Sequence, residues 1–328
     1  MKTVNWGIIG CGNVTEVKSG PAFNLVENSR LAAVMRRNAK LAEDYAKRHK
    51  VPTWYSSADD LINDEEVNAI YIATPPDSHA GLSIRAMKAG KPVYVEKPMA
   101  LDHEQCRKML EVSEETGVPL FVAYYRRALP GFLKVKDLID SGTIGAVKLV
   151  NLQLYRSVSP DERSGILPWR VIPEISGGGH FFDLASHQLD YLDFLLGPVE
   201  KVRSVALNQA ALYKAEDMVS ASFVFPGEVV ATGSWCFTAP EFLERDIIEI
   251  IGEKGSIVFS CFDFTPIELH TSEGRQTFDF PKPDHVQYYL IRQVVEELTG
   301  MGKANSNAVS GARTSRVMDE VVREFRGR

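Results

Sequence analysis

The chain has 328 residues, of which 45% are hydrophobic and 24% are charged, and its net charge of −6 comes from interspersed acids and bases. This length favours two domains, because single hydrophobic cores stop growing at about 250–300 residues. The sequence has no polybasic run typical of a nucleic-acid partner and no apolar run near the roughly 20 residues of a membrane span, so we expect a cytoplasmic protein without either partner.

The first 123 residues alternate strand-length apolar runs with segments of helical periodicity. The predicted strands are VNWGIIG, LAAVM, NAIYIAT, KPVYVE and PLFVAY, and the predicted helices between them are KLAEDYAKRHK, HAGLSIRAMKAG and DHEQCRKMLEVSEETG. Asp102 is expected to cap the last of these helices and Gly117 to end it. Continuous apolar strands that alternate with helices form parallel sheets covered on both faces. We therefore predict an α/β protein whose residues 1–123 form a doubly wound Rossmann domain.

The turn after the first strand, GIIGCGNVT, is typical of a dinucleotide-binding site. Gly10 permits a tight turn, Gly12 lets the backbone approach a pyrophosphate, and Asn13 and Val14 begin the following helix. The third position of this pattern usually holds Gly or Ala, and here it is Thr15. We therefore expect slightly looser packing between the helix and the strand.

The end of the second strand indicates which dinucleotide is bound. An acidic residue there would bind the ribose 2′-OH of NAD, but the sequence reads AVMRRN, with Arg36 and Arg37. A guanidinium can bind a 2′-phosphate through two parallel hydrogen bonds. NADP(H) is therefore the expected cofactor, with NAD(H) as the alternative. The pair could also be a solvated basic turn.

The segment YVEKPMA ends a buried strand on Glu96, Lys97 and Pro98. In open parallel sheets, ligands bind beyond the carboxyl ends of the strands. A surface Glu–Lys pair, which would contribute almost nothing to stability, is the alternative interpretation. One strand earlier, the segment IATPPDSHA supplies further candidates for cofactor contacts: Thr74, Pro75 and His79. For His79 we expect packing at the cofactor's edge or helix capping, not chemistry.

Residues 124–328 are predicted to form a second, α+β domain. After the helix GFLKVKDLIDSG come alternating strands within AVKLVNLQLYRSV, VEKVRSVALNQ, VSASFVF, EVVATGSWCF, DIIEIIG and GSIVFS. The tight turns FPGE and GEKG predict a large, mainly antiparallel, open sheet. The last helix, at about 310–325, is expected to pack back on the first domain. The distant cysteines, Cys11, Cys106, Cys236 and Cys261, predict reduced thiols and no zinc site.

A long helix, HFFDLASHQLDYLDFLL, follows the glycines of SGGG. Asp183, His187 and Asp190 fall on one face of it, which could be a solvent-facing side, part of a reactive site or, with no further ligand in view, a weak metal candidate. The glycines are expected to let the backbone approach a ligand. Residues outside the helix that are candidates for substrate contacts are Arg126, Trp169 and Arg170.

Four segments together resemble the Gfo/Idh/MocA family of NAD(P)-dependent sugar and polyol oxidoreductases: GIIGCG, IATPPDSHA, AGKPVYVEKPMA and GGGHFFDLASHQLDYLDFLLG. The similarity runs from Val4 to about Phe325. It implies that Lys97 reaches the reacting oxygen beside the nicotinamide, with a cis peptide bond before Pro98. It also implies that Asp183 and His187 face the nicotinamide together with Lys97. Association into a homodimer or homotetramer through the second-domain sheet is a further implication.

Hydride transfer to or from a secondary alcohol or ketone requires a group that exchanges the hydroxyl proton and a group that stabilises the oxyanion. We assign these roles to Lys97 and His187, leaving open which does which, and Asp183 orients His187 or accepts a hydroxyl of a carbohydrate or diol substrate. No metal is expected in this site. The alternative functions are a non-catalytic NADP(H)-binding regulatory protein of the same fold and a lyase or hydrolase that recycles its cofactor.

Overall fold

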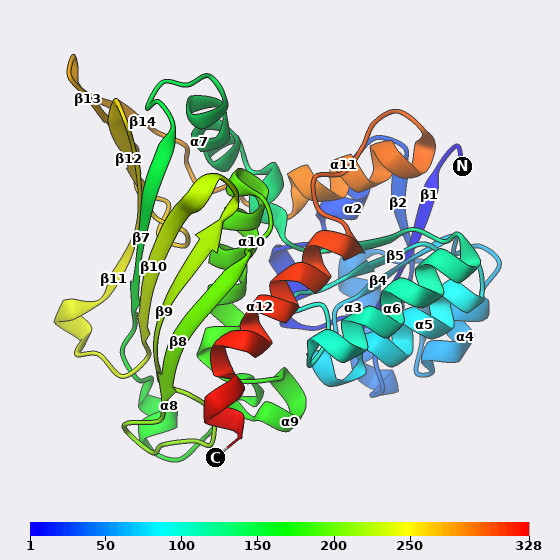
Figure 1. Ribbon diagram of the computed structural model, residues 1–328. Helices are drawn as coiled ribbons and strands as arrows, with labels where there is room; N and C mark the ends of the chain where they lie inside the picture. The colour runs from blue at the N-terminus through cyan, green and yellow to red at the C-terminus, as the bar shows by residue number, and fades with distance from the viewer. Residues whose placement is uncertain (328) are drawn as a thin grey trace. The chain divides into compact units, whose positions relative to one another are not determined.

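The computed structural model describes residues 1–327 and divides into two compact units (Figure 1). One unit comprises residues 1–129 and 283–312, and the other comprises residues 130–282 and 313–327. The predicted ranges, 1–123 and 124–328, assigned every residue after 123 to the second domain, whereas residues 283–312 return to the first unit. The physical reason for this return is helix α11 (Tyr288–Thr299), whose buried Leu290 and Val294 belong to a hydrophobic core of the first unit.

The first unit contains a six-stranded sheet in the order β3-β2-β1-β4-β5-β6, and all its strand pairs are parallel. This confirms the predicted doubly wound domain. The strands are β1 (Val4–Ile9), β2 (Ser29–Met35), β3 (Thr53–Tyr55), β4 (Ala69–Ile72), β5 (Val93–Val95) and β6 (Leu120–Val122). β3 was not predicted, because it has only three residues and none of them is fully buried.

Helices cover both faces of this sheet, and two separate clusters of buried side chains lie between sheet and helices. The helices are α1 (Asn13–Val17), α2 (Ala22–Leu25), α3 (Ala39–His49), α4 (Ala58–Asn63), η1 (Pro76–Ser78), α5 (His79–Lys88), α6 (His103–Thr116), η2 (Tyr125–Ala128) and α11. The predicted limits of α6 are confirmed: Asp102 accepts a hydrogen bond from the Gln105 amide, and Gly117 ends the helix with a φ of 66°.

The second unit contains an eight-stranded sheet in the order β14-β13-β12-β11-β7-β10-β9-β8. Its neighbouring strands are antiparallel except for β7 and β10, which confirms the predicted mainly antiparallel sheet. The strands are β7 (Val147–Tyr155), β8 (Lys201–Leu207), β9 (Met218–Phe225), β10 (Val229–Cys236), β11 (Arg245–Gly252), β12 (Gly255–Phe259), β13 (Ile267–Thr271) and β14 (Gly274–Phe278). β13 and β14 were not predicted.

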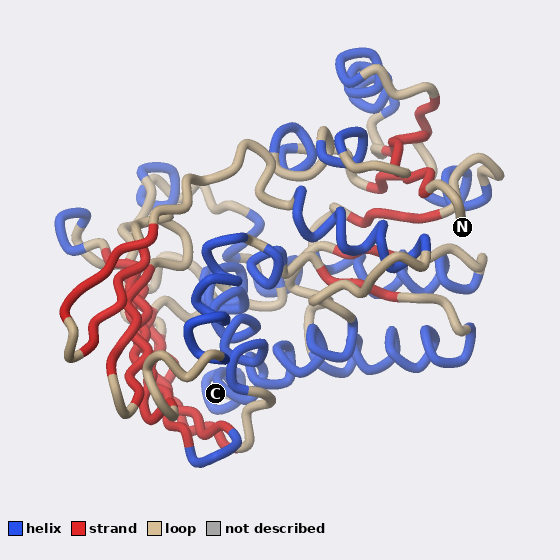
Figure 2. Tube along the Cα trace, turned by 90° about the horizontal axis from the view of Figure 1, so that it is seen from above, coloured by secondary structure: helices blue, strands red, loops and turns tan. Residues whose placement is uncertain are grey.

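Helices lie against one face of this second sheet (Figure 2). On that face, the Trp235 indole donates to the Gln188 side chain at 2.7 Å and stacks edge-on against Phe181. The helical elements are α7 (Pro130–Asp140), α8 (Pro160–Arg163), η3 (Trp169–Val171), α9 (Pro173–Ser176), η4 (Phe181–Ala185), α10 (Ser186–Leu196), η5 (Pro226–Glu228) and η6 (Glu241–Leu243). Helix α12 (Ala308–Arg326) begins in the first unit and ends in the second. Within residues 1–327, no helix combines the length and apolar character that a bilayer crossing requires.

Candidate active site

The glycine turn between β1 and α1 has the geometry of a phosphate-binding turn. Gly10 has a φ of +95°, and a Cβ atom there would lie 2.9 Å from the Thr74 amide nitrogen, so only glycine fits. The Gly10 amide donates to the Met35 carbonyl, which ties the turn to the end of β2. At Gly12, a Cβ atom would meet no atom nearer than 3.8 Å. The open space beside the Gly12 backbone fits the close approach of a dinucleotide pyrophosphate.

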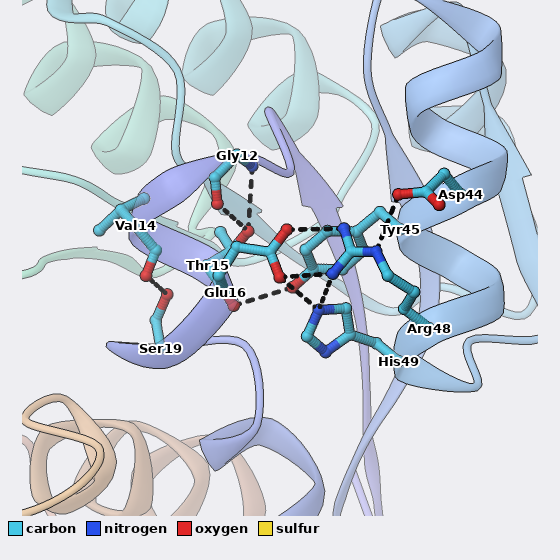
Figure 3. Close-up of polar contacts among 9 residues, drawn as sticks. All are labelled: Gly12, Val14, Thr15, Glu16, Ser19, Asp44, Tyr45, Arg48 and His49. Carbon is cyan, nitrogen blue, oxygen red and sulfur yellow. Dashed lines mark hydrogen bonds and ion pairs between the residues drawn. The ribbon is translucent and has the colours of Figure 1, made fainter.

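Thr15 closes this turn, and the looser packing expected between the helix and the strand stays a prediction. Its side chain is fully buried. Its hydroxyl accepts from the Gly12 amide at 3.0 Å and donates to the Gly12 carbonyl at 2.8 Å (Figure 3). After α1 the chain passes close to the helix at Gly20, where a Cβ atom would lie 2.1 Å from the Thr15 carbonyl oxygen. The helix after the turn, α1, has only five residues.

An ion-pair cluster fastens α1 to α3. The Arg48 guanidinium makes two hydrogen bonds of 2.8 Å to the Glu16 carboxylate and a third to Asp44, and the His49 ring lies 2.7 Å from Glu16 (Figure 3). The hydrogen bonds from Arg48 lower the pKa of Glu16 to about 2. Because Glu16 directly follows Thr15, the cluster restrains the helix that begins at the glycine turn.

The Glu16 carboxylate is expected to give the stability of this protein a specific dependence on acid. Its pKa is lowered from 4.5 to about 2 on folding, so its contribution is complete above about pH 5 and is lost as the pH falls towards 2. The melting temperature of Glu16→Gln should therefore lie below that of the wild type at neutral pH, with the difference shrinking in acid. Thermal unfolding at a series of pH values measures this. Glu43→Gln, which removes a more exposed ion pair to Lys47, is the control and should change little.

Arg36 and Arg37 lie directly after β2, and both are exposed. Neither forms an ion pair with another of the residues 1–327. The amides of Gly10 and Cys11 both donate to the carbonyl of Met35, the residue before Arg36, so Arg36 follows the point at which the glycine turn contacts β2. The two guanidinium groups thus stand next to the predicted dinucleotide site without an acidic partner. The residue after them, Asn38, caps α3.

His79 ties together the chain segments that follow β4 and β5. Its ring nitrogens lie 2.8 Å from the Thr74 carbonyl oxygen and 2.9 Å from the Pro98 carbonyl oxygen. The side chain is fully buried, and burial lowers its pKa although both carbonyl oxygens oppose this. Thr74 also accepts a hydrogen bond from Ser78, and Pro75 directly precedes η1. The candidates Thr74, Pro75 and Pro98 therefore belong to one connected group of loops.

Glu96 and Lys97 do not form a solvated surface pair, so that alternative is wrong. Glu96 is 7% exposed and accepts hydrogen bonds from the side chains of Tyr71 and Gln287. Lys97 is half-buried, and its peptide bond to Pro98 is cis. Lys97 directly follows the carboxylate at the carboxyl end of β5, the same edge of the sheet at which the glycine turn lies. Neither Tyr71 nor Gln287 was identified from the sequence.

In the second unit, Trp169, Arg170 and Asp183 lie together. The Arg170 Nε lies 3.2 Å from the Asp183 carboxylate, and the guanidinium stacks over the Trp169 ring at 4.5 Å. Asp183 lies in a π-helical turn, η4, which continues into α10. His187 and Asp190 on α10 are buried, so this helix face is not a solvent-facing side.

The glycines before η4 make room for the protein's own side chains, and the close approach of their backbone to a ligand stays a prediction. A Cβ atom on Gly178 would lie 2.2 Å from the Phe182 ring, and one on Gly179 would lie 2.8 Å from the Ala215 Cβ. The ring Nε2 atom of the next residue, His180, lies 2.7 Å from the carboxylate of the buried Glu162. Burial favours a higher pKa for the Glu162 carboxyl. The hydrogen bonds from Ser159 and His180 have the larger effect, so the pKa is lowered.

The remaining substrate candidate, Arg126, lies in η2 of the first unit, where it is buried and its guanidinium stacks over the Tyr125 ring at 5.0 Å. The site candidates thus fall into two sets. Lys97, Arg126 and the cofactor candidates belong to the first unit, and Trp169, Arg170, Asp183 and His187 belong to the second. Their catalytic and binding roles stay predictions.

Comparisons with known proteins agree with this two-part organisation. The family model "Oxidoreductase family, NAD-binding Rossmann fold" matches residues 4–124, and "GFO/IDH/MocA C-terminal domain" matches residues 132–258. Oxidoreductase P35 of Formosa agariphila is 39% identical over 96% of this chain and 97% of its own length. Inositol 2-dehydrogenase of Rhizobium meliloti is 30% identical over 88% and 84%, respectively. Levoglucosan dehydrogenase in complex with NADH and levoglucosan shares the fold, with a TM-score of 0.87, 22% identity, and coverage of 99% and 98%.

Proposed function

The chain belongs to the GFO/IDH/MocA oxidoreductase family, and from this membership we propose that it transfers a hydride between NADP(H) and a secondary alcohol or ketone of a sugar, polyol or diol. The observation that carries the proposal is the position of Lys97. It is the second residue after β5, at the edge of the sheet where the glycine turn offers open backbone for a dinucleotide. The names of inositol 2-dehydrogenase and levoglucosan dehydrogenase support the substrate class.

The bound nicotinamide would supply or accept the hydride, and the protein would supply the remaining chemistry. The Lys97 ammonium would hydrogen-bond the reacting oxygen and stabilise its developing negative charge. Either the His187 imidazole or Lys97 itself would exchange the hydroxyl proton. Asp183 is held by Arg170 and would accept a neighbouring hydroxyl group of the substrate. Trp169, whose ring stacks on Arg170, would offer an apolar face to a carbohydrate.

A cofactor titration followed by a turnover assay tests the proposal. Quenching of tryptophan fluorescence by NADPH and, separately, by NADH gives the two dissociation constants. Oxidation of NADPH is then followed with 1,5-anhydro-D-fructose and keto-sugars, and reduction of NADP⁺ with myo-inositol, levoglucosan and aromatic trans-diols. Tight binding with turnover of one of these compounds supports the proposal. Stoichiometric binding without turnover favours a regulatory protein, and a cofactor retained through purification and recycled favours a lyase or hydrolase.

We further propose that the protein forms a homodimer or homotetramer through the open face of the second-unit sheet. This face, opposite the one covered by helices, contains a depression of about 690 Å³ lined by residues of β7 to β11. Three apolar side chains on it are exposed: Val205, Val230 and Ile247. Alternation along β10 places Trp235 on the covered face and Val230 on the open one. A broad face with exposed apolar side chains is typical of an interface between subunits.

Light scattering coupled to size-exclusion chromatography should therefore show a dimer or tetramer for the wild type. Ile247→Glu, which places a charge at the centre of the open face, should shift the protein towards the monomer. Ile166→Glu is the matched control, because Ile166 is 63% exposed and lies outside the sheet. A monomeric wild type, or equal behaviour of the two variants, would rule out association through this face.

A further inference from the structure

Glu96 is a buried carboxylate surrounded by hydrogen-bond donors. One carboxylate oxygen accepts from the Tyr71 hydroxyl and the Gln287 side-chain amide, each at 2.5 Å, and the other accepts from the Lys97 backbone amide at 3.2 Å. Tyr71 and Gln287 are at most 1% exposed. Burial and the nearby charge of Glu96 raise the pKa of Tyr71 well above its ordinary value, so its hydroxyl remains a donor.

A second contact fixes the orientation of the Gln287 amide. The Glu96 carboxylate accepts from the Gln287 nitrogen, which leaves the Gln287 Oε1 atom to accept from the Tyr94 hydroxyl at 2.9 Å. Tyr94 is also fully buried, and its ring stacks on that of Tyr71 at 5.2 Å. The two tyrosines and Gln287 therefore form a preorganised set of donors for a single carboxylate.

The network also reaches the helix of the glycine turn. The hydroxyls of Tyr71 and Ser19 lie 3.1 Å apart, and Ser19 donates to the Val14 carbonyl at 3.3 Å (Figure 3). The backbone amide of Gln287 donates to the Lys18 carbonyl at 3.2 Å. Four separate segments thus meet at Glu96, namely α1 with the turn after it, β4, the end of β5, and the residue before α11.

This arrangement is poorly explained by stability alone. A buried carboxylate loses its hydration, and a well-packed apolar side chain is usually at least as stabilising as a buried charge with its partners. The carboxylate instead fixes the orientation of the Lys97 backbone, because its second oxygen accepts from the Lys97 amide. Small displacements of a catalytic group reduce rates strongly.

We propose that Tyr71 and Gln287 are positioning residues that hold Glu96 so that it fixes the backbone from which the Lys97 side chain extends. This inference rests on the proposed function, in which Lys97 contacts the reacting oxygen. It adds two residues, one from the middle of β4 and one from the segment that returns to the first unit, to the machinery of the reaction.

The test compares Tyr71→Phe, Gln287→Met and a matched control, Ser306→Ala. The control also removes a fully buried hydroxyl from the first unit, one that donates to the Val122 carbonyl. Three measurements are used. Hydrogen exchange of the peptide spanning residues 94–100 reports on the Lys97 amide without any substrate. Steady-state kinetics with the substrate identified by the turnover assay then give kcat and KM, and NADPH titration gives the cofactor affinity.

Tyr71→Phe and Gln287→Met are expected to speed exchange at Lys97 and to lower kcat about tenfold, while KM and the NADPH dissociation constant change less than about twofold. Ser306→Ala should lower only the melting temperature. Tyr71→Phe removes a single oxygen atom, so it decides the question even if Gln287→Met does not fold. Exchange and kcat of Tyr71→Phe equal to those of Ser306→Ala would overturn the inference. Undiminished turnover of Lys97→Ala would instead overturn the proposed function, which separates the two failures.

Discussion

Replacing both Arg36 and Arg37 with alanine is expected to raise the dissociation constant for NADPH about 100-fold, because charge-assisted hydrogen bonds to a 2′-phosphate contribute about 1.5–3 kcal/mol each. The dissociation constant for NADH should change less than about threefold, since NADH offers these residues only a neutral ribose hydroxyl. Both arginines are exposed at the end of β2. Added salt should therefore weaken NADPH binding to the wild type much more than binding to the double variant.

The control for this experiment is Arg30→Ala. Arg30 lies at the other end of β2, where it pairs with Glu66, and its removal changes the net charge without affecting the end of the strand near the glycine turn. If the double variant keeps the NADPH affinity of the wild type, the two arginines form a solvated basic turn. The proposed preference for NADP(H) is then contradicted. If the wild type binds NADH more tightly, the dinucleotide site stands and only the cofactor assignment changes.

The main architecture could be predicted because each sheet leaves a different pattern in the sequence. Strands such as β4 and β5, buried on both faces, read as continuous apolar runs, whereas β10 alternates buried and exposed residues. β3 and β14 could not be found in this way, since β3 has three residues and four of the five residues of β14 are exposed. The return of α11 to the first unit could not be predicted either, because an amphipathic pattern does not indicate which hydrophobic core a helix packs against.

The candidate site shows the same limit on a smaller scale. Motif residues such as Gly10, Glu96 and Lys97 follow strand ends, where parallel sheets bind ligands, and the family resemblance implies the role of Lys97. The hydrogen bonds that hold these motif residues in place could not be predicted, because they join segments that meet only in the folded chain. Gln287 donates to Glu96 across 191 positions in the chain, and Tyr71 looks like any other residue of an apolar strand. The role of the Thr15 hydroxyl could not be predicted, because its hydrogen bonds to Gly12 exist only in the closed turn.

Lys97→Ala is expected to lower kcat about a thousandfold, within the range of roughly 10²–10⁴ that a positioned acid, base or oxyanion donor contributes. Binding of NADPH should weaken less than about threefold, since the phosphate and ribose contacts would remain in place. The same titration and turnover assay measure both quantities. His187→Ala should also lower kcat, and the double variant should lose much less than the product of the two single losses if the residues act on one oxygen.

Lys88→Ala serves as the matched control for Lys97→Ala, because it removes an exposed lysine from the end of α5 in the same unit. Its kinetics should equal those of the wild type. A Lys97→Arg variant sharpens the interpretation further. Arginine keeps a positive charge but does not release a proton, so activity retained by Lys97→Arg would assign oxyanion stabilisation to residue 97 and proton transfer to His187. Loss of activity in both Lys97 variants, with His187→Ala much less impaired, would assign the proton to the lysine instead.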